Sequence, residues 1–536
     1  MNLERPISKL ETTRVITLAF LSARLPSALL AEHVARSLCA ETDASVVLVR
    51  LARPFNGNGA NPPAAPPALP SEIPRTDAGY HFLSVGSSGE LQQPDWIPAV
   101  VEKLRREFRY VLIEAVADDL FTPALFEFLV RSDMGYLFLG ATSEDVYHLD
   151  LLLRELRDHP DSGVDVKPVL CLHEGQIVNG FDALIERVSG QARCFVRGCP
   201  RRENPSERPG NWFRGDIRRL AREIGSCLVG LALSSGAAKG LSHIGVIQVL
   251  EENGIDVDVV AGSSMGAYIG AIWNSGRNGK EMEEIAREME SRWAFWSLID
   301  VAVPPRQGFV RGLAVKRRLQ KSIGRLHFGE LIRPLYIVAT NLATLERVTF
   351  KSGEVADAVH ASVAVPGVCV PVTLAGETYV DGGIVDPLPV DVLREEGVDR
   401  VIAVNAIPTP DRIKYCLQAE RELAQLKKRS AREIVRKLIP VDEHLNYFAR
   451  GNILDILMRS IHGAQICMSE TLARGADIVL RPRICDDRWL DFRSPRRFIE
   501  AGRQIAERHL PEIKALVERN TGASHELAPG KLARIA

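Results

Sequence analysis

Several features are missing from this chain of 536 residues. Its nine cysteines form no CxxC pair, and its formal net charge is −1. The scattered cysteines argue against a zinc site or a disulfide framework, and they predict reduced thiols in a cytoplasmic protein. The balanced charge argues against a nucleic-acid partner for the chain as a whole. We therefore expect neither a bound metal nor a nucleic acid.

Long apolar runs are also missing, because no stretch approaches the roughly 20 residues that cross a bilayer. The run Val15–Ala23 is the candidate for a signal-peptide core, but Glu4 and Glu11 precede it and Arg24 follows at once. We interpret it as a buried first strand. The hydrophobic content of 46% is ordinary for a globular protein, and the length predicts two to three domains.

Strand-like and helix-like segments alternate over the first 200 residues. The expected strands are Arg14–Phe20, Ala44–Leu51, Tyr110–Glu114, Tyr136–Gly140 and Lys167–Leu172, and the expected helices are Pro26–Leu38, Ile97–Arg106, Thr122–Arg131 and Ser143–Arg157. This alternation predicts a parallel sheet covered on both faces. We place a first α/β domain at residues 1–200, with a proline-rich insertion at 54–74, and a linker with a lead-in helix at 201–228.

The layout of this first domain, RYVLIEA followed by a helix and then GYLFLG, resembles the P-loop ATPases of the cell-division kind. A phosphate loop needs glycines and a lysine after the first strand. The corresponding segment here, FLSARLPSALL, has neither. We therefore expect a degenerate P-loop-ATPase-like domain that does not bind ATP.

A second alternation of strands and helices begins with the stretch LALSSGAAKGLSHIGV at residues 231–246. A Walker loop would need glycine where Leu233 and Ala238 stand, and serine or threonine in place of Gly240. Backbone N–H groups at the start of a helix suit a negatively charged oxygen instead. The side chain of Lys239 is interpreted first as solvated or as fixing the loop by a hydrogen bond.

Two further motifs follow. Gly262–Gly266 reads GSSMG, between an apolar strand-like run and a helix of small residues. In a G-x-S-x-G turn the central serine, here Ser264, is exposed on a strained backbone, and a Cβ at Gly262 or Gly266 would strike neighbouring elements. The other motif is YVDGG, in which Asp381 ends a strand-like run; taken alone it is also compatible with a plain Asp-Gly turn.

Together with PLYIVATNL, AVHASVAVPGVCVPV and YVDGGIVDPLPV, these pieces resemble the patatin-like phospholipases over about Val229 to Val404, in order and in spacing. The resemblance implies a three-layer α/β/α catalytic domain, which we place at 229–407, and a serine acyl hydrolase without a cofactor. It implies these roles: nucleophile Ser264, general base Asp381, oxyanion-hole amides of Ser235, Gly236 and Ala237, and turn glycines Gly262, Gly266, Gly382 and Gly383.

The oxyanion loop departs from the family pattern, since Ser234, Ser235 and Ala237 stand where glycine is common. The segment WFRGDIRRLAREIGSCLVGLALSSG narrows the resemblance to the neuropathy-target-esterase branch, whose members act on lysophospholipids and phospholipids. Two alternatives stay open. One is a Ser-His-Asp triad that uses a downstream histidine (His444, His462, His509 or His525), and the other is a catalytically weak or inactive patatin-fold scaffold at a membrane surface.

The stretch Arg306–Arg325 carries seven basic residues and no acidic one, with apolar residues between them. This pattern favours peripheral contact with anionic lipid on the inner membrane surface, and a solvated helix is the alternative. We expect residues 408–518 to form a helical extension that packs on the catalytic domain. Its last helix is expected over Ser494–Glu518, with Ser494 as the cap and Pro495 in the first turn, followed by a tail at 519–536.

Overall fold

The computed structural model describes residues 13–22, 24–51, 70, 72–85, 94–116, 123–158, 164–173, 195–201, 210–291, 299–304, 306–410, 414, 418, 453–484 and 491–518. Most of the proline-rich insertion, most of the linker, the start of the helical extension and the tail lie outside these residues. The chain forms two compact units, of which the first ends at Cys227 and the second spans Leu228–Glu518.

The first unit contains a seven-stranded sheet in the order β3-β2-β4-β1-β5-β6-β7. All neighbouring strands pair in parallel, so the predicted parallel sheet is confirmed. Strands β3 and β7 were not expected from the sequence. The strands are β1 (Arg14–Phe20), β2 (Val46–Leu51), β3 (His81–Val85), β4 (Tyr110–Val116), β5 (Met134–Leu139), β6 (Asp165–His173) and β7 (Phe195–Cys199).

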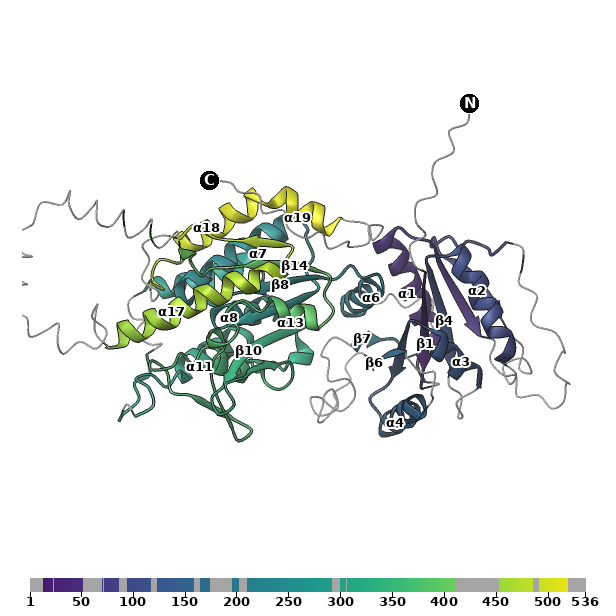
Figure 1. Ribbon diagram of the computed structural model, residues 1–536, viewed down its shortest axis with the longest axis horizontal. Coiled ribbons are helices and arrows are strands. Elements are labelled where there is room, and N and C mark those ends of the chain that lie inside the picture. The colour runs from purple at the N-terminus through teal and green to yellow at the C-terminus, as the bar shows by residue number, and fades with distance from the viewer. Residues whose placement is uncertain are drawn as a thin grey trace, which may run out of the picture. The chain divides into compact units, whose positions relative to one another are not determined.

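Helices cover both faces of this sheet (Figure 1). On one face Ile16, Leu18 and Phe20 of β1 pack with α1 (Ser27–Thr42) and α6 (Asn211–Ile224), while the alternate residues Val15 and Ala19 face the other side. The helices of the second face are α2 (Ile97–Glu107), α3 (Pro123–Arg131) and α4 (Ser143–Asp158). The period of two along β1 thus separates the two apolar layers.

Helix α6, the expected lead-in helix, is bound to the first unit by ion pairs, most of them largely buried. Asp216 accepts hydrogen bonds from Arg197 and Arg219, each at 2.8 Å, and Glu41 of α1 pairs with Arg218 and Arg222. These contacts place α6 with the first unit rather than with the sheet that follows it.

The second unit contains an eight-stranded sheet in the order β12-β13-β10-β9-β8-β14-β15, with β11 also pairing with β10. Strands β8, β9, β10, β14 and β15 are parallel, whereas β11, β12 and β13 run against their neighbours. The strands are β8 (Val229–Leu233), β9 (Val259–Ser263), β10 (Leu335–Asn341), β11 (Arg347–Phe350), β12 (Val372–Leu374), β13 (Glu377–Asp381), β14 (Arg400–Val404) and β15 (Ile478–Leu480).

This sheet is the middle of three layers. One face carries α7 (Ser242–Glu252), α8 (Met265–Asn274), α9 (Gly279–Arg287), α11 (Leu313–Ile323), α12 (Val355–Ser362) and α18 (Pro495–Arg508). The other carries α13 (Val390–Glu395). The α/β/α architecture expected for residues 229–407 is thereby confirmed. Short 3₁₀ turns are η2 (Pro94–Trp96), η3 (Ala237–Leu241), η4 (Glu288–Glu290), η5 (Phe328–Glu330), η6 (Gly382–Ile384) and η7 (Ala473–Gly475).

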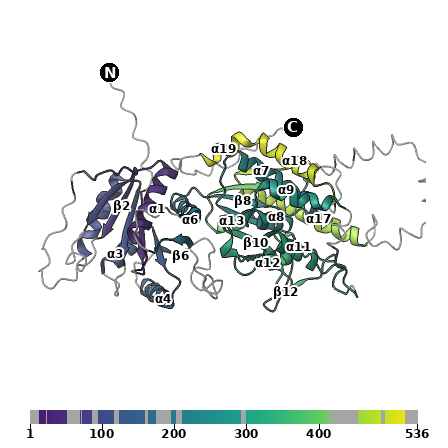
Figure 2. The same cartoon turned by 180° about the vertical axis from the view of Figure 1, so that it is seen from behind.

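Two C-terminal helices pack closely on this unit. Figure 1 and Figure 2 both show α18 lying along α7. The backbones approach at Gly245 and Gly502, where an added Cβ would collide with a carbonyl of the opposite helix. Helix α17 (Ile453–Leu472) lies against the turn η6.

The expected single helix over Ser494–Glu518 is wrong in one respect. It divides at His509 into α18 and α19 (Leu510–Val517), because Pro511 in the first turn of α19 has no N–H to continue α18. Pro495 does occupy the first turn of α18, but the Ser494 side chain makes no capping hydrogen bond.

Candidate active site

Ser264 stands on a sharp turn between β9 and α8. Its backbone has φ 54° and ψ −116°, a conformation that is unfavourable for a residue with a side chain. An added Cβ at Gly262 would lie 2.6 Å from the Ala267 nitrogen, and one at Gly266 would collide with the Leu233 carbonyl. The two glycines therefore let the turn pass between its neighbours, as the motif predicts.

A serine that the sequence analysis missed supports this turn. Ser362, at the end of α12, accepts a hydrogen bond from the Ser264 backbone nitrogen at 2.9 Å and donates one to the Val338 carbonyl at 2.6 Å. Its hydroxyl thus links the strained turn to strand β10. Its residue type alone could not reveal this role, because the contact joins residues 98 positions apart.

Asp381, at the end of β13, lies beside Ser264, which follows β9, because β10 pairs with both strands. The register pairs Val338 of β10 with Ser263 and the adjacent Ala339 with Asp381, which brings the two motifs side by side. The Ser264 hydroxyl donates to Asp381 Oδ2 at 2.5 Å, and the Gly383 amide donates to Oδ1 at 2.7 Å. Each carboxylate oxygen therefore has one donor, and Oδ2 is the atom placed to accept the serine proton.

The carboxyl group of Asp381 is buried, with only 3% of the residue exposed. Burial raises its pKa to about 6, while the hydrogen bonds from Ser264 and Gly383 act in the opposite direction. The group is thus ionised at neutral pH and has a proton affinity higher than that of an ordinary aspartate. These are the properties of an effective general base near neutral pH.

The glycines after Asp381 allow other segments to approach the turn. A Cβ at Gly382 would collide with the Val338 carbonyl, and one at Gly383 would collide with the Ser235 hydroxyl. The same added Cβ at Gly383 would lie 2.7 Å from Nε2 of Gln465 on α17. Strand β10, the oxyanion loop and α17 therefore meet around η6.

The expected oxyanion loop needs one correction. The Ser235 amide donates to the Pro387 carbonyl at 2.8 Å, so it is already occupied. Within the described part of the chain, the Gly236 and Ala237 amides make no hydrogen bond of their own. Ala237 has φ 47°, in the left-handed region that favours glycine. The loop thus offers two amides, not three.

The histidines of the alternative triad do not join this pair. The hydrogen bonds of Ser264 and Asp381 involve no histidine of the described residues. Burial, with a contribution from Lys239, lowers the pKa of His462 to about 4. His509 pairs with Glu512 at 2.8 Å between α18 and α19. His444 and His525 lie outside the described residues.

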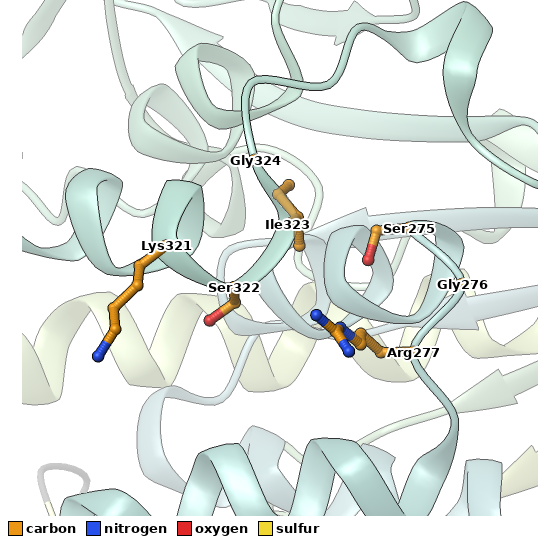
Figure 3. A pocket seen from close by; sticks show the side chains of 7 residues that line it. All are labelled: Ser275, Gly276, Arg277, Lys321, Ser322, Ile323 and Gly324. Carbon is orange, nitrogen blue, oxygen red and sulfur yellow. The ribbon is translucent and has the colours of Figure 1, made fainter.

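A separate cavity of about 410 Å³ lies at the far end of α8 from Ser264. It is lined by Ser275, Gly276, Arg277, Lys321, Ser322, Ile323 and Gly324 (Figure 3). Figure 3 shows Arg277 reaching toward the space while Lys321 extends away from it. Both cations stand near the C-terminal ends of α8 and α11, where they counter the partial negative charge of the helix carbonyls. We assign this cavity no part in the reaction.

Two further findings concern the described residues only. They contain no cluster of three or more histidine, cysteine, aspartate or glutamate side chains arranged to hold a metal ion. They also contain no helix that is both long and apolar enough to pass through a bilayer.

Comparison with known proteins assigns the region around this site. Residues 231–394 match the family model of the patatin-like phospholipases. This region is a patatin-like phospholipase domain. Its boundaries enclose Ser264, Asp381 and the loop Ser235–Ala237, and they exclude α17 and α18.

Relatives of the patatin-like domain carry NTE in their names. Lysophospholipase NTE1 of Pyricularia oryzae is 32% identical over 208 residues, which are 38% of this chain and 14% of that protein. An uncharacterized NTE family protein of Mycobacterium bovis is 37% identical over 177 residues, 33% of this chain and 48% of the relative. The chain thus spans less than half of the length of either relative.

Solved structures give weaker likenesses. VipD from Legionella pneumophila matches with a TM-score of 0.28 and 17% identity, covering 53% of this chain and 67% of VipD. A ParA family ATPase from Chlorobium tepidum matches with a TM-score of 0.28 and 11% identity, covering 40% of this chain and 92% of the ATPase.

Proposed function

We propose that the patatin-like domain hydrolyses fatty-acyl esters of lysophospholipids and phospholipids, with Ser264 as the nucleophile and Asp381 as the general base. The observation that carries this proposal is the 2.5 Å hydrogen bond from the Ser264 hydroxyl, on its strained turn, to Asp381 Oδ2. The relatives named lysophospholipase support the choice of substrate class.

The proposed reaction has two steps. In the first, Asp381 takes the proton of Ser264 while Oγ attacks the ester carbonyl, and the free amides of Gly236 and Ala237 stabilise the negative oxygen. The lysolipid or glycerophospho-alcohol leaves with that proton, and the acyl group stays on Ser264. In the second step, Asp381 takes a proton from water, the resulting hydroxide attacks the acyl ester, and fatty acid is released as Ser264 regains its proton.

The test is release of fatty acid from a panel of lysophospholipids, phospholipids and triacylglycerols, combined with labelling by a fluorophosphonate probe. The wild-type chain should be labelled at Ser264 and should prefer the phospholipid classes. Ser264→Ala should abolish both labelling and hydrolysis. Ser275→Ala, at the far end of α8, is the matched control and should retain both, because its hydroxyl bonds only the Ile272 carbonyl.

The same experiment separates the alternatives. A folded Ser264→Ala protein with full activity would contradict the nucleophile assignment. A wild-type chain without labelling or hydrolysis would favour an inactive scaffold. A His462→Ala or His509→Ala variant as inactive as Asp381→Asn would favour the triad.

We further propose that the region around Arg306–Arg325 contacts anionic lipid. Two of its cations are paired, Lys316 with Asp357 and Arg318 with Glu288. The other five have no acidic partner among the described residues: Arg306, Arg311, Arg317, Lys321 and Arg325. Only 313–323 are helical, so a helix along the whole stretch is not observed.

Apolar side chains stand beside these unpaired cations. Residues 301 and 310 pair as a β-bridge, and Val301 and Val303 before Arg306 are 61% and 75% exposed. Exposed valines next to cations suit insertion at a lipid surface. A variant with Val303→Asp and Arg306→Glu should therefore lose binding to anionic vesicles and activity on bilayer substrate, but keep activity on a soluble short-chain ester. Tyr147→Asp, at another exposed apolar residue, is the control.

For the first unit we propose that ATP is not a ligand. The loop between β1 and α1 turns apolar side chains inward, with Leu21 1% and Leu25 4% exposed. They pack into the apolar core, and the described loop has no glycine or lysine to bind a phosphate group at the start of the helix.

A further inference from the structure

Ser234 is the residue of the oxyanion loop with the most complete set of hydrogen bonds. It is fully buried, and its backbone nitrogen donates to the Val404 carbonyl at 3.1 Å. Its hydroxyl accepts from the Ala406 amide at 2.8 Å and donates to the Ser235 carbonyl at 2.7 Å. Its carbonyl accepts from Nε2 of His243 at 2.9 Å. Every polar atom of Ser234 is therefore engaged.

These bonds determine how two successive peptide planes are oriented. The plane between residues 234 and 235 is held at both ends, by His243 on its carbonyl and by the Pro387 carbonyl on its N–H. The next plane is held at the Ser235 carbonyl by the Ser234 hydroxyl. Because the C=O and N–H of a trans peptide point in opposite directions, this last bond sets the direction of the Gly236 N–H.

The histidine that completes this arrangement is uncharged. His243 is fully buried, and burial lowers its pKa to about 4. A neutral imidazole has a single N–H, and the bond to the Ser234 carbonyl requires that hydrogen on Nε2. Nδ1 has no partner among the described residues, in agreement with this tautomer.

We propose that Ser234 is a positioning residue of the oxyanion hole: its hydroxyl, held by the Ala406 amide, orients the Ser235–Gly236 peptide so that the Gly236 N–H faces the developing oxyanion. The inference rests on the function proposed above. It also explains why a loop with few glycines suits this chain. A glycine loop loses more conformational entropy on ordering, whereas a serine that bonds its own neighbour restricts the peptide before substrate binds.

The test compares Ser234→Gly and Ser234→Ala with Ser242→Ala in the full chain. Ser242 is the matched control, because its hydroxyl is also fully buried but has no partner among the described residues. The Ser234 variants should lower kcat on a soluble short-chain ester by about 10- to 100-fold with little change in KM, as expected when only the transition state loses a donor. Ser242→Ala should leave kcat within about twofold.

Two further measurements separate positioning from folding. Titration of active sites with the fluorophosphonate counts the folded enzyme, so kcat is expressed per reactive Ser264. Backbone NMR relaxation at the Gly236 amide should show greater mobility in Ser234→Gly than in Ser242→Ala, whether or not the wild type hydrolyses the ester. Equal kcat per site and equal mobility in the two variants would overturn the inference. A wild type that is inactive, with Gly236 mobilised only by the Ser234 change, would instead overturn the proposed function.

Discussion

Each unit of this protein begins its sheet with an apolar strand that runs through a short loop into a helix. In the first unit β1 leads into α1, and in the second β8 leads through η3 into α7. The first loop buries Leu21 and Leu25, whereas the second uses small residues and leaves the Gly236 and Ala237 amides unbonded within the described chain. Two loops at the same place in the topology therefore differ: the first buries apolar side chains, and the second has backbone N–H groups without a hydrogen-bond partner among the described residues.

Backbone strain differs between the two junctions in the same way. The described residues of the first loop contain no positive φ, while the second loop places Ala237 at 47°. The neighbouring junction of the second unit, between β9 and α8, places Ser264 at 54°. Such conformations persist only where the surroundings enforce them, and they commonly mark functional sites. The comparison indicates that the candidate site of the second unit requires backbone conformations that lower its local stability.

The largest expected effect concerns Asp381, the proposed general base of the second unit. Asp381→Asn should lower kcat/KM by roughly 10²–10⁴-fold, the usual contribution of a general base. In the wild type, kcat/KM should rise with pH through about 6, because the raised pKa of Asp381 sets where the base becomes ionised. Measured pH–rate profiles of both proteins check this.

Asp386 provides the control for that measurement. Burial also raises its pKa to about 6, but its partner is Arg347 and not Ser264. Asp386→Asn should cost far less activity, and an equal loss would mean that any buried carboxyl in this loop matters for folding alone.

The second prediction concerns stability. Burial raises the pKa of Asp381 in the folded state to about 6, above its ordinary value of 3.8, so ionising the group costs the folded state free energy as pH rises between these values. The penalty is absent below the lower value, complete above the higher one, and on the order of 3 kcal/mol. Asp381→Asn should therefore raise the free energy of unfolding more at pH 8 than at pH 4.5. An equal increase in the free energy of unfolding at pH 8 and at pH 4.5 would contradict the argument that burial raises the pKa of Asp381.

The third prediction measures strain at the elbow. Ser264→Gly should be more stable than Ser264→Ala by about 1–3 kcal/mol, because only glycine relaxes at φ 54°. In α1, an ordinary helix, glycine should instead be the less stable residue. Ala35→Gly should lower the free energy of unfolding by about 1 kcal/mol or more. Denaturant titrations of the three variants suffice, and equal stability of the two Ser264 variants would show that the turn is unstrained.

The smallest expected effect is at the junction of the first unit. Calorimetric titration of the full chain with Mg-ATP should release no heat beyond dilution, because Leu21 and Leu25 are buried at the start of α1 and the loop has neither glycine nor lysine. A micromolar affinity for Mg-ATP would show that the first loop also binds an anion, and it would contradict the difference drawn between the two loops.

Most elements of both sheets could be predicted from local pattern. Strand β1 was expected with its observed bounds, and α2, α4, β4 and β6 within a few residues. Strands β3 and β7 were not expected; each has only five residues, too few for a clear alternating pattern. The break between α18 and α19 was not expected, because the helical pattern of the sequence continues on both sides of Pro511.

The sequence by itself determined that a strained serine turn, an Asp-Gly-Gly turn and a small-residue loop occur in that order, because each depends on residues a few positions apart. Only the tertiary structure decided that β13 runs antiparallel to β10 in the register that brings Asp381 to Ser264. It alone decided that Ser362 supports the elbow, that Pro387 occupies the Ser235 amide and that the Ser234 hydroxyl holds the next peptide. The first two of these contacts join segments about 100 residues or more apart, and the Ser234 hydroxyl depends on a third, the Ala406 amide. Their geometry is set by strand register and helix packing rather than by local sequence.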